Sequence, residues 1–124
     1  MIQIRSVLEV ADNSGAKRIR VIQVHGGSKR RFGYVGNVVS ASVIKADPNG
    51  TVKKGEKVKA VVVRTHKEFK RSGGEYVRFD DNAAVIITAM ENLDPIGTRV
   101  FGPVAREVKN NGSTKIANLA AEVV

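Results

Sequence analysis

Short segments with the periodicity of β-strands recur along this chain, and turn signals rich in glycine separate them. Along residues 18–24, apolar side chains such as Ile19 and Val21 face one side while two arginines face the other. Residues 60–63 (Ala-Val-Val-Val) form an unbroken, largely β-branched run, which is typical of a strand buried on both faces. Such a series of short strands favours a small closed β-barrel over an open sheet, because closure removes the exposed strand edges.

The pattern also predicts a hairpin that stands away from this mainly β fold. We expect strands at residues 7–10, 18–24, 35–44, 58–63 and 82–88. Arms at residues 65–71 and 76–79 turn at Ser72-Gly73-Gly74-Glu75. The arms carry many charges and little apolar material, so the hairpin is expected to project from the barrel.

The C-terminal part changes from strand to helix periodicity. Pro103 is expected in the first turn of a short helix that continues to Val108, and residues 115–122 form a second short helix. The 124 residues therefore predict a single domain, with the barrel over about residues 1–102 and short C-terminal helices over about 103–124.

The charge of the chain is unbalanced and unevenly placed. Lys and Arg number 21 against 12 Asp and Glu, a net charge of +9. Six bases and no acid lie between residues 17 and 31, nine bases and three acids between 53 and 78, and the sign reverses over 79–98. An excess concentrated in this way predicts a polyanionic partner: nucleic acid, an anionic membrane surface or an acidic protein.

Two basic constellations fit the phosphate backbone of RNA. Gly26-Gly27-Ser28 allows backbone N–H groups to approach an anion, and Lys29-Arg30-Arg31 follows, with Phe32 and Tyr34 offering a face to a base or sugar. The predicted hairpin carries the second group of cations, and such a basic ribbon can lie along the RNA backbone or enter an RNA groove. The alternative for both is a charged loop that serves only solubility. Because the chain has six aromatic residues and lacks the RRM signature, we expect recognition of RNA shape and phosphate position.

Catalysis, metals and membranes are poorly supported by the sequence. The chain has no cysteine and only two distant histidines, His25 and His66, so it offers neither a thiol nucleophile nor a multi-histidine metal site. Asp80 and Asp81 are adjacent on a strand-like segment and point to opposite faces. We expect no enzyme, no cofactor and no small-molecule substrate; a hydrolase using Asp80 or Asp81 with His66 is the least favoured alternative. No apolar run approaches the roughly 18 residues of a spanning helix, and no signal peptide is evident. The absence of cysteine suits a protein of the reducing cytoplasm.

Several longer motifs resemble a known family. They are Val-Ala-Asp-Asn-Ser-Gly-Ala at 10–16, Ala-Val-Val-Val at 60–63, Phe-Asp-Asp-Asn-Ala-Ala-Val-Ile at 79–86, and Ile-Gly-Thr-Arg-Val-Phe-Gly-Pro-Val at 96–104. With these motifs the chain resembles, nearly end to end, the universal large-subunit ribosomal protein L-fourteen family of the bacterial and organellar type. The resemblance implies a closed five-stranded β-barrel with a projecting β-hairpin and short C-terminal helices, built into the large ribosomal subunit and bound to its rRNA.

The resemblance also implies partners and contact residues. The implied partners are large-subunit rRNA, a neighbouring large-subunit protein, L-nineteen, small-subunit rRNA across an intersubunit bridge, and a ribosome-silencing factor, in a cytoplasmic or an organellar ribosome. Together with the charge pattern it indicates rRNA contacts at Lys17, Arg18, Lys29, Arg30, Arg31, Lys53, Lys54, Arg64, Lys67, Lys70, Arg71 and Arg78. It indicates intersubunit or protein contacts at Arg99, Phe101, Arg106 and Lys115. The alternative function is a free-standing basic β-barrel that binds nucleic acid in transcription or translation control.

Overall fold

The computed structural model describes residues 2–26, 31–88 and 93–124. Its strands, in chain order, are β1 (Ile2–Gln3), β2 (Val7–Val10), β3 (Ala16–Val24), β4 (Phe32–Gly33), β5 (Val38–Ala46), β6 (Lys57–Arg64), β7 (Phe69–Lys70), β8 (Tyr76–Val77), β9 (Ala83–Ile87), β10 (Val100–Val104) and β11 (Ala120–Val123). The helices of the described residues are α1 (Arg106–Asn110) and α2 (Thr114–Leu119). Neither is long and apolar enough to cross a membrane.

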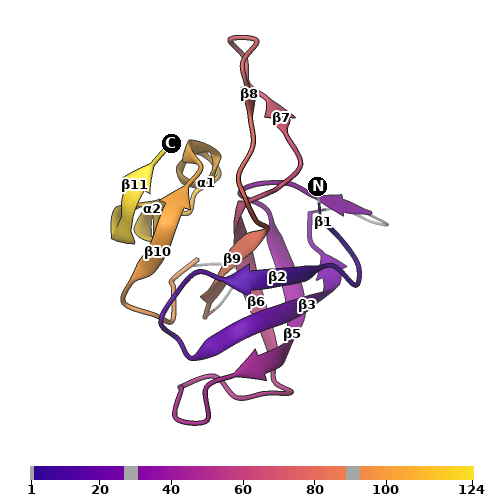
Figure 1. Cartoon of the computed structure of the whole chain (residues 1–124), viewed down its shortest axis with the longest axis vertical. Coiled ribbons are helices and arrows are strands. Elements are labelled where there is room, and N and C mark those ends of the chain that lie inside the picture. The colour runs from indigo at the N-terminus through magenta and orange to yellow at the C-terminus, as the bar shows by residue number, and fades with distance from the viewer. Residues whose placement is uncertain (1, 27–30, 89–92) are drawn as a thin grey trace.

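Strands β2, β3, β5, β6 and β9 close into a barrel, which confirms the fold class predicted from the sequence (Figure 1). Neighbouring strands run antiparallel except β2 and β9, whose parallel pairing at Val10 and Ala84 closes the barrel. The alternation along β3 is confirmed, because Ile19 and Val21 are buried in the barrel core while Arg20 between them is exposed. The alternation thus turns the arginines of β3 outward.

The apolar runs of β6 and β9 are buried on both faces, as their composition predicts. Val62 and Ile86 point into the barrel and join its core, whereas Val61 and Val85 lie on the outer side. The outer residues belong to a second core, which the C-terminal segment completes with Val104, Ala105, Val108 and Ile116. This segment therefore covers the outer side of β9 and the part of β6 that carries Val61 and Val63, whereas the outer side of β3 remains exposed.

The C-terminal segment departs from the predicted pair of helices. Pro103 lies in β10, not in a helix, and α1 begins only at Arg106. Helix α2 ends at Leu119, and residues 120–123 form β11, which pairs in parallel with β10. A helix of six residues is marginal without tertiary support. In β11 the backbone groups instead find hydrogen-bond partners on β10, which satisfies them beyond the helix end.

The hairpin forms as predicted and stands away from the barrel as a two-stranded ribbon of β7 and β8 (Figure 1). Its tip is closed by backbone hydrogen bonds from the Arg71 N–H to the Glu75 carbonyl and from the Gly74 N–H to the Arg71 carbonyl, at 2.8 and 2.9 Å. Gly74 has φ +85°, a conformation that glycine adopts without strain. The ribbon strands are only two residues long each, so contacts with other parts of the chain must hold the direction of the ribbon.

Candidate nucleic-acid interface

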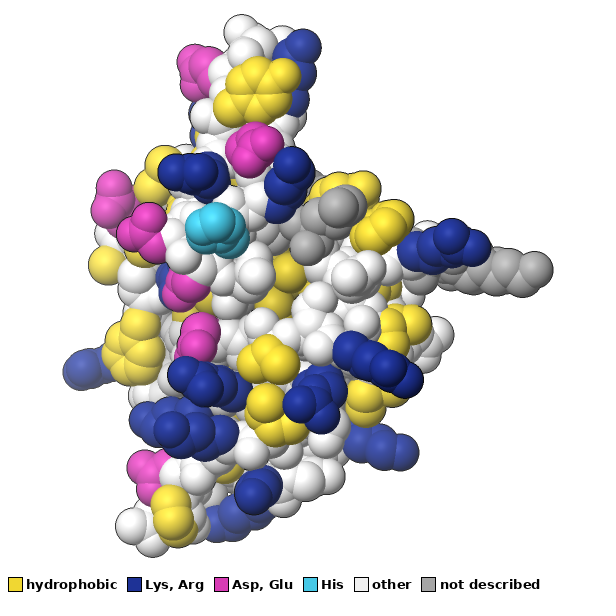
Figure 2. Space-filling view, turned by 45° about the vertical axis from the view of Figure 1, so that its right-hand side comes forward, with side chains coloured by type: hydrophobic (Ala, Val, Ile, Leu, Met, Phe, Trp, Pro, Cys, Tyr) yellow, Lys and Arg dark blue, Asp and Glu magenta, His cyan; other side chains and the backbone are white. Residues whose placement is uncertain are grey.

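Several exposed Lys and Arg side chains lie on the outer face of strands β3, β5 and β6. Strand register places Arg20 opposite Ser42 and Ser42 opposite Lys57, so the two cations flank a small side chain on one face. Ser40 likewise lies opposite Lys59, whereas Arg18 lies directly opposite Lys45 and pairs with Glu9 of β2 at 3.1 Å. We call this surface the barrel wall; its cations are Arg18, Arg20, Lys45, Lys57 and Lys59. Figure 2 shows Lys and Arg side chains gathered over the lower, barrel half of one face.

The barrel wall contains four cations that were not among the predicted rRNA contacts: Arg20, Lys45, Lys57 and Lys59. All four are exposed. The signal that could have found them is their alternation with apolar residues, since Arg20 lies two residues after Arg18 and Lys59 two after Lys57. The alternation shows which face of a strand each cation occupies. It does not show which residues of distant strands lie opposite one another, because that depends on the strand register. Beside the wall, a depression of about 550 Å³ runs past Lys57, Lys59 and Ile22.

The loops next to the barrel carry further predicted contacts. Lys53 and Lys54 lie in the loop before β6 and are exposed, and the Lys53 ammonium donates a hydrogen bond of 3.0 Å to the Pro48 carbonyl; Lys17, also exposed, lies at the start of β3. Lys29 and Arg30 lie outside the described residues. Arg31, which follows them, is exposed. These positions leave the predicted phosphate contacts of the loops sterically accessible where the structure describes them.

On the ribbon, three of the predicted contacts are exposed: Lys67, Lys70 and Arg78. Lys67 pairs with Glu68 at 3.3 Å on the surface. Hydrogen bonds from its own backbone N–H and from Lys67, with attraction to Lys67 and Arg78, hold the pKa of the Glu68 carboxyl below its ordinary value of 4.5. Glu68 therefore stays charged and offsets part of the positive potential at the ribbon base.

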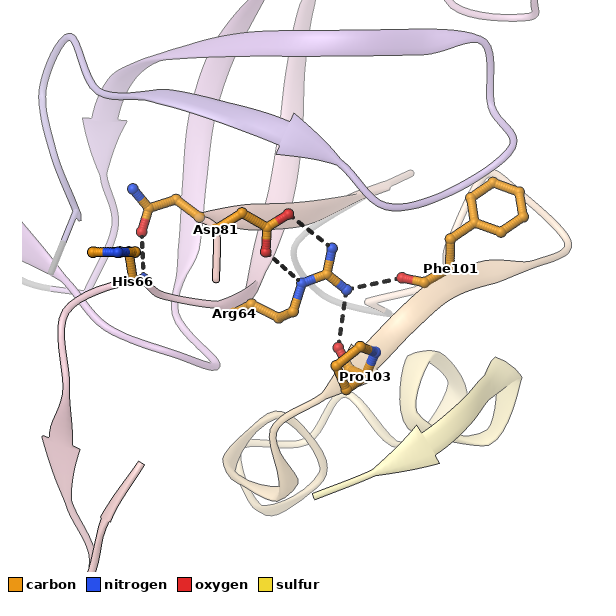
Figure 3. Close-up of polar contacts among 6 residues, drawn as sticks. Arg64, His66, Asp81, Phe101 and Pro103 are labelled. Carbon is orange, nitrogen blue, oxygen red and sulfur yellow. Dashed lines mark hydrogen bonds and ion pairs between the residues drawn. The ribbon is translucent and has the colours of Figure 1, made fainter. Parts of the chain in front are cut away.

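Arg64, which the sequence groups with the cations of the predicted hairpin as an rRNA contact, does not lie on the ribbon. It is the last residue of β6, its side chain is only 10% exposed, and its guanidinium is engaged on every side (Figure 3). Nε and Nη2 donate to the two carboxylate oxygens of Asp81 at 2.9 and 3.3 Å. Nη1 donates to the carbonyls of Phe101 and Pro103 at 2.8 and 3.0 Å. Arg64 thus joins the barrel to β10.

Gly102, between the two accepting carbonyls, makes room for this guanidinium. A Cβ at this position would lie 2.6 Å from Nη1 of Arg64, and the residue has φ +77°. The glycine of the Phe-Gly-Pro motif is therefore required by the arginine that binds the motif.

Arg71 lies on the ribbon but faces inward. Its Nε and Nη2 donate to the two carboxylate oxygens of Glu107 in α1, both at 2.9 Å, and Nη2 also donates to the Val124 carbonyl at 2.7 Å. Its guanidinium carbon lies 5.7 Å from the centre of the Phe69 ring. Arg71 therefore ties the tip end of the ribbon to α1 and to the residue that follows β11, which explains how so short a ribbon keeps its direction.

The predicted intersubunit or protein contacts extend from the end of the loop before β10 to α2. Arg99, Phe101, Arg106 and Lys115 are exposed, and Lys115 pairs with Asp94. The loop before β10 is held to the barrel by Asn13, whose Oδ1 accepts hydrogen bonds from the N–H groups of Thr98 and Arg99 at 2.8 and 3.2 Å. We call the four predicted contacts, Arg99, Phe101, Arg106 and Lys115, the C-terminal surface.

Asp12, which precedes Asn13, anchors the turn between β2 and β3 to strand β9 of the barrel. Its Oδ1 accepts from the Ser14 N–H and hydroxyl, and its Oδ2 from the Ile86 N–H. Burial raises the pKa of the Asp12 carboxyl above its ordinary value of 3.8, although these hydrogen bonds act in the opposite direction. The turn that carries the Ala-Asp-Asn-Ser-Gly motif is thus a structural anchor.

Comparison with known families agrees with this architecture. Residues 1–124 match the family described as ribosomal protein L14p/L23e. The chain belongs to this family. As an L14p/L23e protein it is a structural component of the large ribosomal subunit, has no enzymatic role, and is located in the ribosome in association with rRNA.

The surroundings of His66 agree with a non-enzymatic L14p/L23e protein. Both carboxylate oxygens of Asp81 are occupied by Arg64, and the ring of His66 lies away from them (Figure 3). Where the structure describes the chain, no three His, Cys, Asp or Glu residues are grouped as metal ligands would be. The least favoured alternative is a hydrolase using Asp80 or Asp81 with His66. Its Asp81 form lacks the required geometry, and the family assignment argues against both forms.

The Arg71–Glu107 pair gives this L14p/L23e protein a specific pH dependence. Burial opposes ionisation of Glu107, but hydrogen bonds from Arg71 and its own backbone N–H, with attraction to Arg71 and Arg106, hold the pKa of its carboxyl below the ordinary 4.5. A lowered folded-state pKa contributes stability above the unfolded-state pKa, and this stability is lost as the pH falls through the folded value.

We therefore expect Glu107→Gln to lower the free energy of unfolding at pH 7 by about 1 kcal/mol, since the pair is partly exposed. The difference from the unmodified chain should shrink below about pH 4.5 and disappear at lower pH. Urea unfolding at several pH values measures it. Glu122→Gln, an exposed position on β11, is the matched control; an equal, pH-independent loss in both variants would contradict the role of the pair.

Proposed function

We propose that the chain binds large-subunit rRNA through the barrel wall and the exposed cations of the ribbon. The observation that carries this proposal is the barrel wall itself, where register aligns Arg20 with Lys57 across three strands of a closed barrel. A rigid scaffold holds these cations at set spacings, and phosphates brought close together by rRNA folding need such neutralisation. Small serines between the cations let a backbone approach the sheet.

The C-terminal surface supports a second part of the proposal, a contribution to an intersubunit bridge. Phe101 exposes 52% of its surface beside the exposed cation Arg99, a combination suited to a macromolecular contact. We infer that this surface meets small-subunit rRNA, the neighbouring protein L-nineteen and, in ribosomes that have one, a silencing factor. The chain acts in this proposal as a single domain, because the second core joins barrel and C-terminal segment.

Co-sedimentation tests the function. The chain is expected to migrate with large ribosomal subunits in a sucrose gradient at moderate salt. Lys57→Glu on the barrel wall should shift it toward the top of the gradient, whereas Lys109→Glu, an equal charge reversal on α1, should not. If the unmodified chain stays at the top, the free-standing nucleic-acid-binding module is favoured. If both variants behave alike, the barrel wall is not the binding surface.

A further inference from the structure

We propose that the groove between the ribbon and α1 holds one unstacked nucleotide of rRNA. The base would enter an apolar cavity beside Phe69, and its phosphate would lie at the cationic end of the groove near Lys70 and Arg106. This inference rests on the proposed rRNA binding and goes beyond it, because it assigns a base-binding site to a protein whose other cations address phosphates.

The apolar half is a cavity of about 390 Å³ at the ribbon base. Tyr34, Val35, Thr65 and Phe69 contribute to its mainly apolar lining. The volume falls within the range of small-molecule sites. Tyr34 is 49% exposed, so its ring is accessible to a ligand, and Phe69 supplies a second ring. Aromatic side chains of this kind stack on any base, because every base has a π-face.

The polar half adjoins the apolar one. It is a hollow of about 410 Å³ between the ribbon tip and α1, and Lys70 and Glu107 line both spaces, which makes the groove continuous. Its lining contains three cations and two acids. One of the acids, Glu107, is already paired with Arg71. Lys70 and Arg106 are exposed and thus available to an anion.

A nucleotide matches both halves together. An aliphatic side chain of a partner protein would fill the cavity but would leave the cations at the far end without an anion as the groove closes, which costs free energy. A nucleotide combines a flat, largely apolar base with a phosphate on the same residue.

Affinity measured over a range of salt concentrations tests this site. Tyr34→Leu and Phe69→Leu keep apolar bulk but remove a ring, and Tyr76→Leu is the control, since Tyr76 lies on the same ribbon, is 67% exposed and does not line the cavity. We expect each of the first two variants to bind large-subunit rRNA roughly 5- to 100-fold more weakly with an unchanged salt slope, because stacking releases no counterions. Lys70→Ala should reduce the slope by about 1.

Ultraviolet crosslinking of intact large subunits, followed by mass spectrometry, gives an independent readout. A nucleotide adduct on the peptide that contains Tyr34 or Phe69 is expected. Adducts confined to other peptides, or Tyr34→Leu and Phe69→Leu variants that bind like Tyr76→Leu, would overturn the nucleotide site while leaving rRNA binding intact. A crosslink from this groove to a protein would assign it to a protein partner and overturn the site as well. An unmodified chain that fails to bind rRNA would overturn both proposals.

Discussion

Arg64→Ala is expected to lower the free energy of unfolding by about 3 kcal/mol. The substitution removes four hydrogen bonds, leaves the Asp81 carboxylate without its cation, and leaves the carbonyls of Phe101 and Pro103 without their donor. Breaking a buried ion pair costs about 3–5 kcal/mol. The lower end applies because the Asp81 side chain is 40% exposed, so water compensates part of its loss.

Urea or thermal unfolding measures this effect, with Arg78→Ala as the matched control. Arg78 is an exposed arginine that follows β8, and its removal should change stability by no more than about 0.5 kcal/mol. In rRNA binding, measured at a temperature at which both variants are folded, the order should be the opposite: Arg78→Ala should weaken binding more than Arg64→Ala. Equal stabilities, with the weaker rRNA binding in Arg64→Ala, would show that Arg64 contacts RNA and that its internal pairs are incidental.

The affinity of the chain for isolated large-subunit rRNA is expected to fall on the order of 10³–10⁵-fold between 50 and 200 mM salt, for about six to ten phosphate contacts. Each neutralised phosphate releases condensed counterions, so added salt opposes binding. The barrel wall, the neighbouring Lys17, Lys53 and Lys54, and the exposed ribbon cations together provide enough charge for this number.

Filter binding over this salt range gives the slope of log affinity against log salt. Lys57→Gln should make the slope shallower by about 1, whereas Arg64→Gln should leave it unchanged because its guanidinium is committed inside the protein. A slope near zero for the unmodified chain would rule out phosphate neutralisation as the basis of binding.

The strand pattern was predictable from sequence because it depends on neighbouring residues. Alternation along β3 and the unbroken runs of β6 and β9 specify which faces are buried, and Gly73-Gly74 specifies a turn. The C-terminal segment was not predictable in this way. Its last residues have helical spacing, but the strand β11 forms because β10 lies beside it, a partner about twenty residues away that the local pattern does not contain.

The candidate site divides in the same manner. Charge density identified the two basic regions, but arginines are alike in sequence whether they face solvent or the protein interior. Lys70 and Arg71 are neighbours, yet one is exposed and the other is bound to Glu107. Likewise, nothing near Lys57 in sequence indicates that it shares a face with Arg20.

From its amino acids alone, this protein was determined to be a small basic β-barrel with a projecting ribbon, since backbone preferences, burial patterns and net charge are local or additive properties. Only the tertiary structure decided which cations remain free for a polyanion. That choice depends on partners brought together by folding, such as the Asp81 carboxylate that binds Arg64 and the Glu107 carboxylate that binds Arg71.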